Sequence, residues 1–381
     1  MKRMGILMAA LAVAFFVQSA QAQWTSAKRI TWTSGNSASP AIKVDSSGHL
    51  HVVWADRTPG NYEVYYKNST DGGTTWAASQ RLTWTSNDSK GPSLAIDSSD
   101  HLHVVWWDYT PGNYEVYYKK STDGGASWTT TKRITWTSEN SYGPDIAVDL
   151  SDNLHVVWYD SPVESEIYYK KSTDGGANWT TTRRITWTEG STGHPAISVD
   201  PSGHLHVVWD DSTPGSAAIY YKKSEDGGET WTASRRITWA ADDARYPVLG
   251  IDSSGHLHVA WEDYLTGPGE ICYKKSEDGG TTWTASKRLT WTSGGSHDPD
   301  IAVGSSGLLY VVWEDSTPGN YEIYCKKSTD GGATWAASQR LTWTSSWSDD
   351  AAIAAHSLSD VHAVWADEAP GNFELYYRRN K

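Results

Sequence analysis

The chain has 381 residues, of which 38% are hydrophobic, so it is long enough to bury a sizeable core. Its formal net charge of −13 argues against nucleic acid and anionic membranes as partners. Its two cysteines are too few for a disulfide-built scaffold, so a packed core must hold the fold together.

The N-terminus has the pattern of a secretory signal peptide. A basic start at residues 1–3 precedes an apolar run over residues 4–17, and the small residues SAQA at 19–22 fit a cleavage site. The apolar run is too short to span a membrane, and no second one follows it in the sequence. We therefore expect residues 1–22 to be a signal peptide and residues 23–381 to form one domain. We also expect secretion into the periplasm or the extracellular space, without membrane insertion.

Two motifs recur seven times along the rest of the chain, at intervals of 51 or 52 residues. The first is R-[IL]-T-W, which ends at Trp32, Trp84, Trp136, Trp187, Trp239, Trp291 and Trp343. The second is W-x-D, which ends at Asp56, Asp108, Asp160, Asp211, Asp263, Asp315 and Asp367. The chain is therefore built from seven copies of one unit.

Each unit contains four short segments that are typical of strands. In the first copy they cover residues 40–45, 49–56, 62–67 and 81–84, and Gly, Pro, Ser, Asn and Asp separate them. Four strands in each of seven repeats predict an all-β fold, a seven-bladed β-propeller of four-stranded antiparallel blades. The chain begins with a fourth strand alone and ends with the first three, so we expect the N-terminal strand to join the last blade and close the ring.

An acidic octapeptide, STDGGTTW in the first copy, lies between the third and fourth strands. Its aspartates are Asp71, Asp123, Asp174, Asp226, Asp278 and Asp330. The glycine pair supplies positive φ angles, and the carboxylate can accept hydrogen bonds from its own turn. We therefore interpret these aspartates as structural.

With this octapeptide the chain resembles the bacterial neuraminidase repeat, or Asp-box, family, whose motif is S-x-D-x-G-x-[TS]-W. The resemblance implies a sialidase-like β-propeller with its boxes on the side away from the ligand. Sialidases of that family grip a carboxylate with three arginines, and they use a Tyr nucleophile assisted by a Glu and an Asp acid/base. Apart from the arginines of the repeats and at strand ends, only Arg57 and Arg245 lie on loops that face the axis. Three converging arginines are therefore not expected.

The fifth copy holds the best candidates for catalysis. One loop carries Asp242, Asp243, Arg245 and Tyr246, and the next carries Glu262, Asp263 and Tyr264. Carboxylates beside Tyr and Arg are the ingredients of a glycosidase. The alternative is drift on solvent-exposed loops.

The W-x-D motif offers repeated binding sites, because a Trp face stacks on a sugar and an Asp accepts from its hydroxyls. In the alternative interpretation the Trp is core between blades and the Asp closes a turn. Two other tryptophans, Trp107 and Trp347, belong to none of the repeated tryptophan series and are better stacking candidates. Six histidines recur at one strand position, with Tyr310 in the sixth copy, and we interpret them as structural. We expect no metal and no cofactor.

Three hypotheses about function follow. The first is a secreted multivalent module that binds an extracellular glycan or glycoprotein through its repeats. The second is an exo-sialidase-like glycoside hydrolase. The third is a structural surface scaffold without a small ligand.

Overall fold

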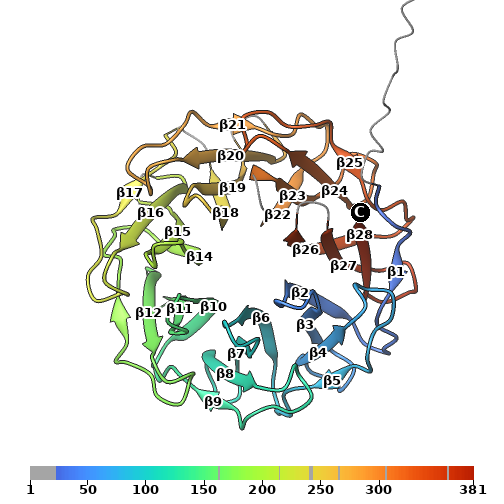
Figure 1. Ribbon diagram of the computed structural model, residues 1–381, viewed down its shortest axis with the longest axis horizontal. Helices are drawn as coiled ribbons and strands as arrows, with labels where there is room; N and C mark the ends of the chain where they lie inside the picture. Colours follow the sequence, from blue (N-terminus) through green and yellow to red (C-terminus); the bar gives the residue numbers. More distant parts are fainter. Residues whose placement is uncertain are drawn as a thin grey trace, which may run out of the picture.

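The computed structural model describes residues 23–161, 164–213, 215–239, 243–264, 267–304, 307–357 and 360–381. Within them, seven four-stranded antiparallel sheets stand as blades around a central axis, so the predicted seven-bladed propeller is confirmed (Figure 1). The predicted signal peptide and Asp242 lie outside the described residues.

We number the blades 1 to 7 in chain order. The innermost strands are β2 (Ser37–Val44), β6 (Ser89–Ile96), β10 (Asn140–Val148), β14 (Thr192–Val199), β18 (Ala244–Ile251), β22 (Ser296–Val303) and β26 (Ser348–Ser357). The second strands are β3 (Leu50–Asp56), β7 (Leu102–Asp108), β11 (Leu154–Ser161), β15 (Leu205–Asp211), β19 (Leu257–Asp263), β23 (Leu309–Asp315) and β27 (Asp360–Asp367). The third strands are β4 (Glu63–Ser69), β8 (Glu115–Ser121), β12 (Glu166–Ser172), β16 (Ala218–Ser224), β20 (Glu270–Ser276), β24 (Glu322–Ser328) and β28 (Glu374–Asn380). The outer strands are β5 (Gln80–Arg81), β9 (Lys132–Arg133), β13 (Arg183–Arg184), β17 (Arg235–Arg236), β21 (Lys287–Arg288), β25 (Gln339–Arg340) and β1 (Lys28–Arg29).

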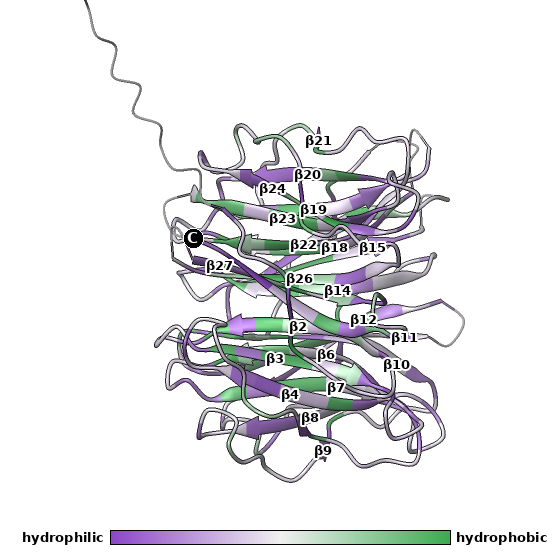
Figure 2. Cartoon of the chain, turned by 90° about the vertical axis from the view of Figure 1, so that its right-hand side faces the viewer, coloured by the Kyte–Doolittle hydropathy of each residue, from purple (hydrophilic) through white to green (hydrophobic). Residues whose placement is uncertain are grey.

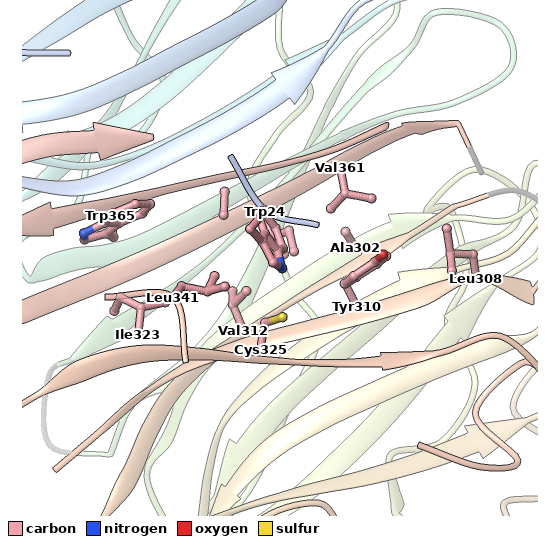
Figure 3. Packing of buried hydrophobic residues seen from close by; sticks show 12 residues of the cluster. Trp24, Ala302, Leu308, Tyr310, Val312, Ile323, Cys325, Leu341, Val361 and Trp365 are labelled. Carbon is pink, nitrogen blue, oxygen red and sulfur yellow. The ribbon is translucent and has the colours of Figure 1, made fainter. Parts of the chain in front are cut away.

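The N-terminal strand closes the ring as predicted. β1 pairs with β28, so the last blade is completed by the start of the chain. Beyond this pairing, Trp24 reaches into a buried cluster with Tyr310 and Cys325 of blade 6 (Figure 3). The two ends of the chain are therefore fixed by backbone pairing and by apolar packing together.

The core lies between blades, where the second strands are almost entirely buried and carry runs of hydrophobic residues (Figure 2). Trp54 and its six equivalents are at most 1% exposed. The Trp54 ring stacks on Tyr65, with 5.7 Å between the ring centroids. The Trp of W-x-D is thus core between blades, which was the alternative interpretation of this motif.

Two of the four predicted strands differ from the structure by three residues at one end, and the other two by one or two residues. The innermost strand of blade 1 begins at Ser37, three residues earlier than predicted, because a β-bulge between Ala38 and Ala41 carries the pairing across the proline. The outer strand has only two residues, because the Thr83 hydroxyl accepts the hydrogen bond of the Val64 N–H (2.8 Å) in place of a backbone carbonyl. Trp84 therefore lies beyond the strand.

The repeated octapeptide is a turn, as predicted. Asp71 accepts hydrogen bonds from the Thr75 hydroxyl (2.6 Å) and the Thr75 N–H (2.7 Å), and these lower the pKa of Asp71 to about 2. The second glycine of each box packs against the preceding blade: at Gly125 a Cβ atom would lie 2.2 Å from the Tyr66 ring. Because the box follows the third strand, it lies at the end of the blade opposite to the start of β2.

The repeated histidines belong to buried polar triads. In blade 2, His103 contacts the Asp97 carboxylate (3.1 Å) and the Tyr118 hydroxyl (2.8 Å), and burial lowers the pKa of His103 to about 4. In blade 6 all three residues are replaced together, by Gly304, Tyr310 and Cys325. In blade 7 His356 stands at the aspartate position, and His362 keeps its contact with the Tyr377 hydroxyl (2.7 Å) and pairs with Asp360 instead. The buried partners of these histidines fit the structural role that we expected for them.

Candidate functional site

A cavity of about 480 Å³ opens on the axis where the innermost strands begin. We call this opening the axial mouth. Each innermost strand enters it through the bulge, at a residue with φ between 45° and 53°. These bulge residues are Ser39, Gly91, Gly143, His194, Tyr246, Asp298 and Asp350. Five of the seven are not glycine, and a left-handed conformation costs such residues roughly 1–3 kcal/mol each. Strain of this kind accumulates at functional sites.

Two more variable positions accompany each bulge residue. The residue before it pairs across the sheet with the middle residue of W-x-D, as Tyr142 does with Tyr159 and His297 with Glu314. The seven middle residues are Ala55, Trp107, Tyr159, Asp210, Glu262, Glu314 and Ala366. The mouth is therefore built from three positions per blade that vary within otherwise repeated strands.

Blades 4 to 7 give the mouth an acidic half. Its six carboxyl groups belong to Asp210, Glu262, Asp298, Glu314, Asp349 and Asp350. Glu314 is buried and hydrogen-bonds to both Asp298 and Asp349. Burial, reinforced by these neighbours, raises the pKa of Glu314. Desolvation also raises the pKa of Asp298, and it raises that of Asp350 to about 6. This part of the mouth consequently holds protons to a higher pH than ordinary carboxyl groups do.

Glu262 lies at the centre of a second group. Its carboxylate is only 1% exposed and lies 2.5 Å from His297 Nδ1. The Tyr264 hydroxyl lies 3.4 Å from the same nitrogen and also hydrogen-bonds Glu262. The bond to Glu262 raises the pKa of His297, whereas burial is the main cause of the raised pKa of Tyr264. The group therefore favours a protonated imidazole beside a neutral phenol.

An aromatic arc continues from this acidic half around the mouth. It consists of Tyr246, His194, Tyr159, Tyr142 and Trp107, with successive ring centroids 4.2 to 5.9 Å apart. His194 Nδ1 is fixed by the Asp210 carboxylate at 2.8 Å. Tyr246 is 36% exposed, so part of the arc is open to a ligand.

Most of the residues that we predicted as catalytic come together at the mouth. Arg245, Tyr246, Glu262 and Tyr264 all lie there, and Arg245 Nε donates to the Asp243 carboxylate (2.9 Å) at the rim. Asp263 lies apart from them, because its carboxylate accepts from the Trp261 indole N–H (3.1 Å).

The aspartates of W-x-D are turned into the blades. Those at 56, 108, 160, 211, 315 and 367 are buried, and Asp263 is half-buried. In blade 1 the Asp56 carboxylate accepts from the Ser37 hydroxyl and the Thr58 N–H, both at 2.8 Å. This is the turn-closing role of the alternative interpretation. Of the two other stacking candidates, Trp107 joins the aromatic arc, and Trp347 is 51% exposed with its edge toward Tyr321.

Sequence reasoning missed several residues of the mouth. They are Tyr142, Tyr159, His194, Asp210, His297, Asp298, Glu314, Asp349 and Asp350. The signal that identifies them is variation within a repeat: they occupy the three columns that differ between copies whose flanking residues are the same. An alignment of the seven copies with each other would have shown these columns.

Cationic side chains are few at the mouth. Among the described residues that line the cavity, Lys43 carries the one permanent positive charge, and Lys90 and Arg245, the residues before the bulge in blades 2 and 5, add two more at the edge of the mouth. Three converging arginines do not occur in this part of the described chain. The described residues also contain no group of three or more His, Cys, Asp or Glu placed to hold a metal ion. They form no helix long and apolar enough to cross a membrane.

The chain was compared with known proteins. Residues 153–372 match the BNR repeat-like domain. A sialidase of Bacteroides fragilis (strain YCH46) is 25% identical over 277 residues, which cover 61% of this chain and 50% of the relative. The chain thus spans about half the length of that curated relative.

Two solved structures illustrate the likeness in fold. An ulvan lyase bound to -[GlcA(1-4)Rha3S]- matches with a TM-score of 0.66 and 12% identity, over 92% of this chain and 95% of that one. An α-L-arabinofuranosidase of Fusarium graminearum matches with a TM-score of 0.57 and 14% identity, over 76% and 92%. At these identities the comparison establishes a shared fold alone.

Proposed function

Because the BNR repeat-like match covers more than half of the chain, the chain belongs to that family, and from this premise we propose that it binds a glycan without acidic groups at the axial mouth. The observation that carries the proposal is the composition of the mouth, where an aromatic arc faces six carboxyl groups. The predicted signal peptide supports a location outside the cytoplasm, where such glycans occur.

The two halves of the mouth suit the two faces of a sugar. Tyr246 and His194 present ring faces for its C–H surface, and the carboxyl groups accept hydrogen bonds from its hydroxyls. A sialic acid or uronic acid would add another negative charge to carboxyl groups whose pKa is already raised by burial and by their proximity to one another. Each of these carboxyl groups that is ionised costs such a ligand roughly 3 kcal/mol, at about 6 Å and an effective dielectric constant of about 20.

Titration calorimetry with neutral oligosaccharides tests the proposal. Tyr246→Ala is expected to weaken binding at least tenfold, because it removes the exposed ring of the arc. The matched control is Tyr109→Ala, which removes a Tyr of similar exposure (40%) outside the arc and leaves the affinity unchanged. Tighter binding of a sialylated glycan than of its desialylated counterpart would contradict the proposal.

Glycoside hydrolysis is a second candidate, and the protonated carboxyl pair favours it. Asp298 lines the cavity and hydrogen-bonds to Glu314, and the pKa of both is raised. The pair therefore holds a proton to a higher pH than an ordinary carboxyl group does, and Asp298, which lines the cavity, is placed to donate it to a glycosidic oxygen. Glu262, on the neighbouring blade, supplies the second carboxyl group that this reaction needs.

A panel of neutral aryl glycosides tests for this activity. Asp298→Asn is expected to lower kcat at least 100-fold with little change in KM, because the amide preserves the shape of the site and cannot donate the proton. Equal turnover by Asp298→Asn and the unmodified protein would exclude this role. Binding without any turnover would leave the binding function as the sole one.

A further inference from the structure

Seven tryptophans on the outer side of the ring are exposed, in contrast to the buried tryptophans of W-x-D. They end the R-[IL]-T-W motif just beyond each outer strand, and each is 63–69% exposed. They are Trp32, Trp84, Trp136, Trp187, Trp239, Trp291 and Trp343, which we call the rim tryptophans. A large aromatic residue left open at every one of seven equivalent positions needs an explanation, because folding gains nothing from exposing it.

The backbone on both sides of the rim tryptophan is fixed in six of the seven blades, and in blade 4 Ala218 replaces the glutamate that makes this contact. At Trp32, Arg29 Nε donates to the Thr31 carbonyl (2.7 Å), and the Thr33 N–H donates to the Glu374 carboxylate (2.6 Å). Glu374 is fully buried and also pairs with Arg29 at 2.8 Å. An exposed ring on so constrained a segment is a preorganised contact surface.

The next blade adds a buried cation beside each ring. Lys67 of blade 1 donates to the Ile30 carbonyl of the outer strand of blade 7 (2.6 Å), and its ammonium lies 5.7 Å from the centroid of Trp32. The same contact occurs at the other junctions, with distances of 5.2 to 5.8 Å. At the last junction Arg378 takes the place of the lysine. The surroundings of each rim tryptophan thus come from two adjacent blades. Because the ring is closed, all seven tryptophans have a neighbouring blade that supplies this cation.

We propose that the rim tryptophans form a sevenfold docking surface for a polysaccharide, separate from the axial mouth. Each ring stands alone between threonines and an arginine, so the rim is not one continuous apolar patch of the kind that binds a protein. An isolated, rigid indole is instead suited to stack on the C–H face of one sugar ring. A polymer of repeated sugars engages several such rings at once, and weak contacts then add up to tight binding.

The surface does not depend on the function proposed for the mouth. The arginine, threonine and tryptophan of the rim motif are the same in every copy, whereas the mouth residues differ between copies. Identical residues at seven positions suit a polymer that presents the same sugar repeatedly. A set of different residues suits the recognition of a single sugar, whose sides differ from one another. The rim tryptophans are therefore expected to hold the protein on a polysaccharide, while the axial mouth binds a single glycan chain.

The proposal is tested with particles of cellulose, chitin and xylan in a sedimentation assay. The variants change one (Trp136→Ala), three and all seven rim tryptophans to alanine, with Leu150→Ala as an exposed apolar control outside the rim and the mouth. Because the rim tryptophans are exposed, circular dichroism and the melting temperature should stay close to those of the unmodified protein. The amount bound is expected to fall about threefold for the single variant and at least 100-fold for the sevenfold variant. Iodide quenching of tryptophan fluorescence should decrease when the unmodified protein binds.

Three results would overturn the proposal. The first is a folded sevenfold variant that binds the particles as well as the unmodified protein. The second is loss of binding through Tyr246→Ala alone, which would assign polysaccharide binding to the mouth. The third is a change in self-association in the sevenfold variant, measured by sedimentation velocity, without a change in polysaccharide binding. If the axial mouth does not bind oligosaccharides, the test of the rim tryptophans is unaffected, because the two sites are measured with different ligands and variants.

Discussion

Substitution of Asp160 by asparagine is expected to stabilise the protein, whereas the same substitution of the equivalent residue in the neighbouring blade, Asp108, is expected to destabilise it. In blade 2 the Asp108 carboxylate accepts a hydrogen bond from the Thr110 N–H at 2.8 Å. The residue at the corresponding position of blade 3 is Pro162, which has no N–H to donate. Asp160 is buried (5% exposed) without this donor, and burial raises its pKa to about 6.

The sign and size of the effect follow from the two pKa values of Asp160. In the unfolded chain this carboxyl titrates near 3.8, so between pH 3.8 and 6 the folded protein holds a proton that the unfolded chain releases. The contribution of Asp160 to stability therefore falls as the pH rises through this window. A shift of about 2 units, at about 1.4 kcal/mol per unit, amounts to about 3 kcal/mol above pH 6.

The substitution Asp160→Asn removes this cost. The Ser141 hydroxyl (2.6 Å) and the Trp158 indole N–H (2.8 Å) both donate to Asp160 Oδ1, which the amide oxygen replaces. At pH 8 the variant should gain up to about 3 kcal/mol in unfolding free energy, and at pH 4 it should gain almost nothing. Denaturation in guanidinium chloride, followed by circular dichroism at both pH values, measures the difference.

Asp108→Asn is the matched control. Asp108 accepts from Thr110 through Oδ1 and from the Ser89 hydroxyl through Oδ2 (2.6 Å), so an amide nitrogen must face one of the two donors. This variant should lose about 1–3 kcal/mol at pH 8. The reasoning is refuted if Asp160→Asn is destabilised at pH 8 as much as Asp108→Asn.

Two further predictions concern the repeated scaffold. Gly125→Ala should lose more than about 3 kcal/mol, because its Cβ would lie 2.2 Å from the Tyr66 ring, whereas Gly112→Ala, with a similar positive φ and open space around it, should lose only about 1 kcal/mol. Thermal denaturation compares them, and equal losses would contradict packing of the box on the neighbouring blade. Acidification from pH 7 to pH 4 should destabilise the protein, because the pKa of His103 falls from its usual 6.5 to about 4 on folding and the unfolded chain then binds the extra proton. His103→Gln should reduce this pH dependence, and an unchanged slope between pH 4 and 7 would exclude His103 as a source of it.

The seven-bladed scaffold was predictable because the same pattern of strands and motifs recurs seven times in the sequence. The spacing of 51 or 52 residues gave the number of blades, and the incomplete ends of the chain gave the closure between β1 and β28. The bounds of the strands were less accurate at Ser37 and Trp84. There a bulge and the Thr83 side chain replace regular pairing, and strand propensity contains no signal for either.

The mouth was only partly predictable, because its contacts join residues of different copies. Tyr246, Glu262 and Tyr264 drew attention as an unusual group within one copy. His297 looked unremarkable alone, and its partner Glu262 lies 35 residues earlier, in the preceding blade. Such a pair becomes visible only when the ring geometry specifies which positions of adjacent blades meet.

The bulge explains how one repeated unit carries both a varied site and a uniform rim. At the bulge residue the left-handed backbone carries the strain, and the side chain is directed to the cavity. Ser39, His194, Tyr246 and Asp298 therefore occupy the same conformation, and the backbone accepts a different side chain in each copy. Most rim tryptophans instead follow a segment that a buried glutamate and a cation of the next blade hold in place, so their surroundings are repeated. The axis is thus diverse because only the backbone conformation is repeated there, whereas at the edge the side chains are repeated as well.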